Sequence, residues 1–214
     1  YGMIAGADTE VNANTRAGVA FAYANSDIDG NDVNTTETDI DSYQITLYAN
    51  TDLMDNYFVN SQLGYMYNDI DSERNDVGGI AGNTASADYH SNQFTARAEL
   101  GRQMLTANDV TLIPSALVNY NFIDTTDYSE SGAGGLGLSD VETDDLHILE
   151  LGVNMMAQKT FDDMHGGLIT PDLHVGYRYD VIGDNVATTA ALAGGGGLGG
   201  AGSAADMGRW EQQL

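Results

Sequence analysis

Apolar and polar residues alternate along two neighbouring stretches near the middle of the chain. In residues 149–158 one face carries Leu149, Leu151, Val153, Met155 and Ala157, and the other carries Glu150, Gly152, Asn154, Met156 and Gln158. Successive side chains of a β-strand point to opposite sides of the sheet, whereas a helix would scatter the polar residues among the aliphatic ones. The pattern therefore predicts a strand with one apolar face and one mostly polar face.

The preceding stretch repeats the alternation. Its apolar face carries Pro114, Ala116, Val118, Tyr120 and Phe122, and its polar face carries Ser115, Asn119 and Asn121. Each run lasts about ten residues, compared with about five or six in a typical globular strand. A tilted strand needs about 9–11 residues to cross a bilayer, so strand length is the first indication of a membrane protein.

The same alternation predicts strands in residues 16–23, 43–50, 57–68, 93–101 and 171–179, and the tail of a strand in residues 1–7. The predicted connections alternate in length. Short turns fall at 8–14, 51–56, 102–109 and 160–167, and long polar, acidic or Gly-rich loops fall at 25–41, 69–91 and 128–139. In an up-and-down meander, alternate connections lie at opposite ends of the sheet. Short turns at one end and long loops at the other are typical of outer-membrane barrels.

Aromatic residues collect near the predicted strand ends, where the rings of an interfacial girdle lie at the level of the lipid head groups. They are Tyr23, Tyr43, Tyr57, Tyr65, Tyr67, Tyr120, Phe122, Tyr177 and Tyr179. A soluble β-sandwich also has alternating strands, but it does not require strands this long or loops segregated by length. We therefore favour an all-β, antiparallel, up-and-down transmembrane β-barrel.

Electrostatics assigns the two faces of this barrel. An arginine on the lipid face at the bilayer midplane costs about 2–4 kcal/mol, and Arg16, Arg97 and Arg178 share a face with Glu99 and Glu150. That face is predicted to line the pore. Its pore-lining candidates are Arg16, Gly18, Gln62, Gly64, Arg97, Glu99, Glu150, Gly152, His174, Gly176 and Arg178.

Composition restricts the partners and the chemistry. The chain has 214 residues, 26 glycines, 2 prolines and no cysteine, so neither disulfides nor thiolate metal sites can form. The net charge of −25 would repel nucleic acid, and a nucleic-acid partner is not expected. The mean hydropathy of −0.25 does not argue against a barrel, because its lipid face occupies only alternate residues. The chain has no signal peptide and begins within a strand pattern, which we interpret as a cut from a longer protein.

No motif predicts a catalytic, cofactor-binding or metal site, and no cofactor is expected. The acidic segment at residues 27–32 lacks the spacing and terminal Glu of an EF-hand, which favours a solvated loop. The histidines His90, His147, His165 and His174 share no metal-ligand spacing. Asp88 and His90 would be the candidates for an enzyme at the extracellular rim, but no nucleophile accompanies them, so we do not expect an enzyme. The glycines at 132–137 lack the Lys-Ser/Thr ending of a phosphate loop.

Several segments resemble the β-domain of classical autotransporters, which belong to type V secretion. They include LIPSALVNY at 112–120, DYSESGAGGLGLS at 127–139, LELG at 149–152, LITPDLHVGYR at 168–178 and AALAGGG at 190–196. Shorter segments at 6–8, 15–23, 41–44 and 47–48 agree, and together they follow the family order over nearly the whole chain. The ordered set is more specific than any single segment.

The resemblance implies a twelve-stranded barrel in the Gram-negative outer membrane that anchors its own N-terminal passenger and helps export it to the cell surface. Its implied partners are the passenger, a pore helix, outer-membrane lipids and the barrel-assembly machinery. The family's first strand and closing strands are missing, so we expect an incomplete barrel of about eight to nine strands. Residues 1–193 would form the partial barrel and residues 194–214 a Gly-rich segment leading into a missing strand.

Small pore-facing residues would leave room for a helix, and the charged ones would contact that helix or the passenger. The alternative is that small inward residues only fit the taper of the barrel. The alternative function is a passenger-less outer-membrane channel or surface-interaction barrel, and a soluble acidic β-protein is a third.

Overall fold

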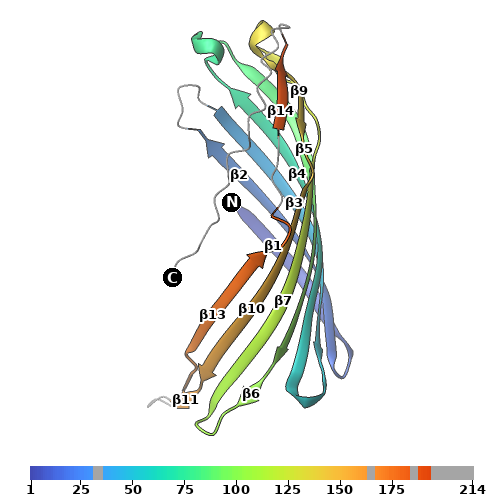
Figure 1. Ribbon diagram of the computed structural model, residues 1–214, viewed down its shortest axis with the longest axis vertical. Coiled ribbons are helices and arrows are strands. Elements are labelled where there is room, and N and C mark those ends of the chain that lie inside the picture. The colour runs from blue at the N-terminus through green and yellow to red at the C-terminus, as the bar shows by residue number, and fades with distance from the viewer. Residues whose placement is uncertain (31–35, 163–166, 184–187, 194–214) are drawn as a thin grey trace.

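A wide antiparallel sheet dominates the computed structural model, which describes residues 1–30, 36–162, 167–183 and 188–193. Each long strand pairs with its predecessor in chain order, and the strands form a curved wall (Figure 1). The eight long strands are β1 (Gly2–Asn12), β2 (Thr15–Asp29), β3 (Thr36–Asp52), β4 (Tyr57–Arg74), β5 (Ala85–Arg102), β7 (Val110–Thr125), β10 (Leu146–Lys159) and β13 (Asp172–Asp180). Within the described residues β1 and β13 are the two edges, so the sheet is open. The prediction of an incomplete up-and-down barrel is confirmed.

Shorter strands and turns lie at the two ends of the wall. They are β6 (Met104–Leu105), which pairs with β7, β8 (Ser131–Gly132), which pairs with β5, β9 (Leu138–Thr143) with β14 (Thr188–Leu192), and β11 (Phe161–Asp162) with β12 (Leu168–Ile169). The 3₁₀ turns are η1 (Met54–Asn56), η2 (Val77–Gly79) and η3 (Gly134–Leu136). Among the described residues, no helix has the length and apolarity needed to span a membrane.

The connections segregate by end, as the sequence predicts. The turns at 13–14, 53–56 and 103–109 lie at one end of the wall, and the connections after β4 and β7 lie at the other (Figure 1). In the turn between β3 and β4, Asp55 and Asn56 have φ values of 60° and 63°. Positive φ at both central residues is what a tight type I′ hairpin requires, and Asp and Asn tolerate it well.

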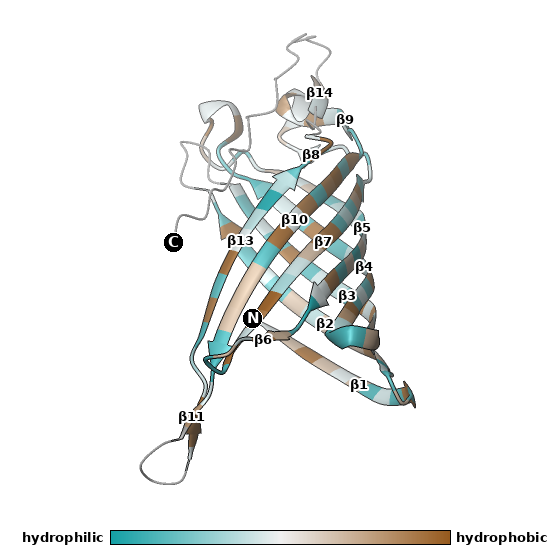
Figure 2. Ribbon diagram, turned by 60° about the horizontal axis from the view of Figure 1, so that its bottom comes forward, coloured by the Kyte–Doolittle hydropathy of each residue, from teal (hydrophilic) through white to brown (hydrophobic). Residues whose placement is uncertain are grey.

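The register places apolar side chains on one face of the wall across many strands. Phe21, Ile45, Tyr65, Phe94 and Phe122 are successive cross-strand partners from β2 to β7, and partners in an antiparallel sheet project to the same side. Apolar and polar residues alternate along these strands in Figure 2. We call this side the outer face and the opposite side the lumenal face.

The outer face has no second layer over it in the described structure. Leu47, Leu63 and Leu151 remain 54%, 51% and 50% exposed, whereas a sandwich would bury such residues between its sheets. A contiguous apolar face of this extent on a single sheet marks a surface that contacts another apolar phase. The arrangement favours the barrel over the soluble sandwich.

Three predicted boundaries are wrong because the strands continue past the apolar band. The predicted loop 25–41 contains the end of β2 and the start of β3, the predicted loop 69–91 contains the end of β4 and the start of β5, and the predicted turn 8–14 is mostly β1. In the extensions of β2 to β5 the acidic residues face outward, while Ile28, Ile40 and Ile70 lie on the lumenal face. In the β1 extension, by contrast, Asp8 and Glu10 are lumenal. Asp27 and Asp29 therefore belong to a strand, whereas Asp32 lies outside the described residues. Residues 194–214, predicted to lead into a further strand, also lie outside them.

Candidate functional site

The predicted pore-lining residues all fall on the lumenal face. One continuous register row joins Gly18, Tyr48, Gln62, Arg97, Asn119, Glu150 and Asp180 from β2 to β13. The adjacent row joins Arg16, Asn50, Asn60, Glu99, Leu117, Gly152 and Arg178. Gly64, Gly176 and His174 lie in flanking rows of the same face. The register brings these residues together from strands far apart in the sequence; their contact with a passenger stays a prediction.

A polar network crosses β5, β7 and β10 on this face. Arg97 lies 3.8 Å from Glu99, and the Ser115 hydroxyl donates to the Glu99 carboxylate at 2.6 Å. Asn119 Nδ2 donates to Glu150 at 2.8 Å. Both carboxylates therefore keep a hydrogen-bond donor within the wall, which fixes their orientation and leaves their remaining lone pairs for a molecule in the lumen.

A second charged group lies near the β1 edge. Arg16 lies 3.2 Å from Asp8 and 3.6 Å from Glu10, and the Tyr48 hydroxyl donates to Asp8 at 3.2 Å. At the β13 edge, His174 Nε2 lies 2.7 Å from Asp172. The lumenal face thus offers charges of both signs at several heights.

Most lumenal glycines are covered by a large side chain from a neighbouring strand. A Cβ on Gly18 would overlap the Tyr48 ring, one on Gly101 would overlap the Phe58 ring, and one on Gly152 would lie 2.9 Å from Leu117 Cγ. A Cβ on Gly176 would overlap the Asn154 amide. These glycines therefore fit side chains of the wall itself, which supports the alternative that small residues shape the barrel. Gly64 differs, because its Cβ would meet Gln44 Nε2 at an ordinary 3.4 Å.

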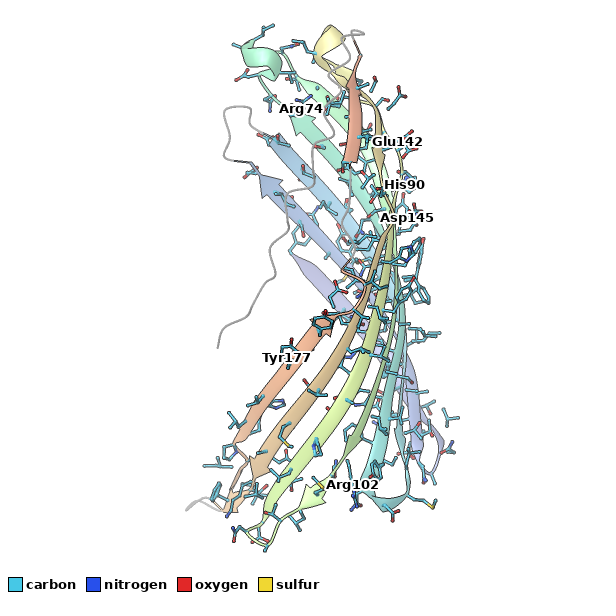
Figure 3. All side chains as sticks on the ribbon, in the orientation of Figure 1. Arg74, His90, Arg102, Glu142, Asp145 and Tyr177 are labelled. Atoms are coloured by element: carbon cyan, nitrogen blue, oxygen red, sulfur yellow. The ribbon has the colours of Figure 1, made fainter. Side chains whose placement is uncertain are left out.

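The long-loop end contains a packed unit that the sequence did not reveal. We use the term loop unit for residues 75–84 and 126–145 with the strand ends they cover. Arg74 Nε and one terminal nitrogen, Nη2, donate to the two carboxylate oxygens of Glu130 at 2.8 and 2.5 Å. The Glu130 side chain is only 8% exposed, and it also accepts the Leu138 backbone N–H at 2.7 Å. This bidentate pair raises the pKa of Arg74. It joins the end of β4 to loop 126–145 on the lumenal side of the wall's upper end, where Figure 3 labels Arg74.

Apolar packing reinforces the loop unit. The rings of Tyr89 and Tyr128 stack with centroids 4.2 Å apart. Val77, Ala85, Ala87 and Val141 are buried there, and Leu117 is the other buried apolar side chain of the described residues. The only sequence signals for this unit are Ala85, Ala87 and Tyr89, which alternate ahead of the predicted strand.

Acidic residues form rows on the outer face just beyond the tyrosines of the same end. Asp27, Asp39, Asp71 and Asp88 are direct cross-strand partners on β2 to β5. A proton shared with Asp27 raises the pKa of Asp39, and one shared with Asp88 raises the pKa of Asp71; desolvation and the neighbouring carboxylates Glu37, Asp41 and Asp69 add to these shifts. Like charges directly opposite each other destabilise a sheet, so electrostatic repulsion between these carboxylates destabilises this part of the sheet at neutral pH.

Asp88 and His90 lie on the outer face as well. Asp88 opposes Asp71, and His90 lies 5.5 Å from the Tyr67 ring. Ser91, the next residue after His90, points to the lumenal face and accepts a hydrogen bond from Asn68. Within the described residues Asp88 and His90 do not form a nucleophile–base arrangement with Ser91.

The wall has the geometry of an outer-membrane barrel, and comparison with known proteins defines the family. The model of the autotransporter beta-domain matches residues 1–214, so the chain belongs to the autotransporter β-domain family. This family is an outer-membrane barrel that serves secretion. No curated protein matches the chain significantly.

Two solved structures share the fold. The translocator domain of the autotransporter NalP from Neisseria meningitidis superposes with a TM-score of 0.70 at 15% identity, over 89% of this chain and 68% of that domain. The β-domain of the Bordetella autotransporter BrkA superposes with a TM-score of 0.59 at 17% identity, over 88% of this chain and 74% of that domain. The agreement at such low identity shows a shared fold.

Proposed function

We propose that this chain forms the wall of an outer-membrane translocator that anchors its own N-terminal passenger and helps export it to the cell surface. The observation that carries the proposal is the pair of register rows on the lumenal face. They align Gln62, Arg97, Glu99 and Glu150 at neighbouring heights, opposite an apolar outer face. An extended polypeptide in transit exposes backbone donors and acceptors, and such a lining can pair with them transiently.

The proposed roles differ between the charged and the small residues. Arg97, Glu99 and Glu150 present oriented charges to the polypeptide or to the pore helix. Gly64 leaves the wall open between Gln44 and Thr95, because its hypothetical Cβ meets both only at ordinary contact distances. Gly18, Gly152 and Gly176 act within the wall by accommodating Tyr48, Leu117 and Asn154.

Surface display tests the proposal. An epitope tag is placed N-terminal to Tyr1 in the full-length protein, and its exposure on intact Gram-negative cells is measured by added protease. Barrel assembly is measured separately by heat-modifiable gel migration. Gly64→Leu should lower tag exposure while the folded barrel persists, because the new side chain narrows the lumen.

Leu63→Phe is the matched control, since residue 63 is adjacent but lies on the outer face. Equal tag exposure in the wild type and the Gly64→Leu variant, both with folded barrels, would contradict the lumenal role. A folded wild-type barrel that never exposes the tag would instead favour a passenger-less channel.

A further inference from the structure

A groove crosses the outer face near the short-turn end of the wall. It has a volume of about 770 Å³, within the range of about 300–1,000 Å³ that bound small molecules occupy. Its floor is formed by Pro114 and Ala116 on β7, and Leu100 and Met104 lie on one side and Val153 and Met155 on the other. All of these side chains belong to the outer face.

The sequence explains why the groove forms at this place. The β5–β7 ladder stops at Gly101 and Ser115, and pairing with β7 resumes only at Met104 and Leu112. The gap lies opposite Pro114, which has no N–H to donate. The Gln103 N–H continues the β4–β5 pairing by donating to the Asn56 carbonyl at 2.9 Å. The β5–β7 ladder is therefore interrupted next to Pro114, and a groove lies over Pro114 and the small Ala116.

A cationic side chain lies at the rim of this groove. The Arg102 guanidinium carbon lies 4.9 Å from the centroid of the Tyr57 ring, and both residues line the groove. Figure 3 labels Arg102 at the lower end of the wall. An arginine stacked on an aromatic ring keeps its N–H fork free for an anion while its stem covers apolar surface.

The charge of the outer face is polarised between the two ends. Among the described basic residues, Arg16, Arg74, Arg97 and Arg178 lie on the lumenal face, whereas Arg102 and Lys159 lie on the outer face at the short-turn end. The opposite end of the outer face carries the aspartate rows of β2 to β5. Because the protein has a net charge of −25 and the aspartate rows lie at the opposite end, the Arg102 end is the part of the outer face that accommodates an anionic group.

We propose that this groove binds one anionic phospholipid, with an acyl chain lying over Pro114 and Ala116 and the phosphate held by Arg102. Arginine binds phosphate through two parallel N–H···O bonds, and an acyl chain matches an open groove whose floor and sides carry Pro114, Ala116, Leu100 and Val153. The short-turn end then faces the phospholipid leaflet. The inference rests on the outer-membrane placement of the wall but not on passenger export.

Native mass spectrometry of the full-length protein, purified in detergent and incubated with phosphatidylglycerol, tests the inference. The wild type should retain one lipid per chain. Arg102→Gln should weaken retention about tenfold, as expected for the loss of a charge-assisted hydrogen bond, and should remove the preference over phosphatidylethanolamine. Ala116→Phe should abolish retention because the ring fills the groove.

Two matched controls separate a site from general attraction. Ala49→Phe places a ring on the outer face of β3, away from the groove, and Lys159→Gln removes the second outer-face cation of the described strands; both variants should retain the lipid as the wild type does. Equal losses in Arg102→Gln and Lys159→Gln, or full retention in a heat-modifiable Ala116→Phe barrel, would overturn the inference. Absence of a retained lipid in a folded wild-type barrel would also overturn it, whereas absence of any heat-modifiable form would refute the barrel itself.

Discussion

The ion pair between Arg74 and Glu130 should hold the loop unit in place. The two residues are 56 positions apart in sequence, and their side chains are 25% and 8% exposed. Arg74→Gln or Glu130→Gln leaves one partner as an uncompensated, mostly buried charge. We expect the structure of residues 128–143 to loosen while the membrane-spanning part of the wall stays folded.

The expected magnitude follows from burial. Removing one partner of a fully buried ion pair costs about 3–5 kcal/mol, and the partial exposure of Arg74 lowers this to about 2–3 kcal/mol. The free energy of local opening falls by the same amount, so amide hydrogen exchange in residues 128–143 should accelerate about 30- to 150-fold. The Glu130 variant should also expose the Leu138 N–H, which loses a charged acceptor.

This acceleration is measured by hydrogen-exchange mass spectrometry on the detergent-solubilised barrel. The Arg74→Gln/Glu130→Gln double variant should lose less than the sum of the two single variants, because the pair is removed together. Unchanged exchange in residues 128–143 in both single variants would refute the reasoning. Strict additivity would show that the two side chains do not act as a pair.

Two further predictions concern pH and packing. Because the pKa values of Asp39 and Asp71 are raised in the folded state, the stability that these two carboxyls contribute is fully present below the unfolded pKa of about 4 and is lost as pH rises through the folded pKa values. Asp41, whose pKa is lowered by hydrogen bonds from Tyr23 and Asn25, acts in the opposite sense. The wild type should therefore gain more protection from exchange in β3 and β4 on acidification than Asp39→Asn/Asp71→Asn does, and equal gains would contradict the assignment. Gly152→Leu should lower the amount of heat-modifiable barrel, because the new side chain meets Leu117. Adding Leu117→Ala should restore that amount. A normal amount of folded barrel in the Gly152→Leu single variant would contradict the packing of Leu117 against Gly152.

The sequence predicts the strand order and the faces because both depend on local alternation. Leu149, Leu151 and Val153 on β10 share the face that their spacing assigns to them, opposite Glu150 and Gly152. Alternation is a property of one strand at a time, so no long-range information is needed. The short-turn positions follow from the same pattern.

Other features depend on register between strands and could not be read from one sequence. Gly152 is small because Leu117 lies across from it on β7, and Arg74 meets Glu130 only because loop 126–145 folds back over β5. The extensions of β2 and β3 were missed because Asp27, Asp29 and Asp39 resemble loop composition. The alternation of these aspartates with Ile28 and Ile40 is the sequence signal that indicates continued strands.

In a membrane-spanning wall, consecutive residues of one strand face lipid and the pore lumen in turn. The chain has no cysteine, so single-cysteine spin labels can be placed at Thr46, Leu47, Gln62 and Leu63 in the full-length protein without background. In liposomes, labels at Leu47 and Leu63 should collide with dissolved oxygen and be protected from a water-soluble nickel reagent, while labels at Thr46 and Gln62 should show the reverse. Equal accessibility at neighbouring positions would contradict a membrane-spanning wall with a lipid face and a lumenal face.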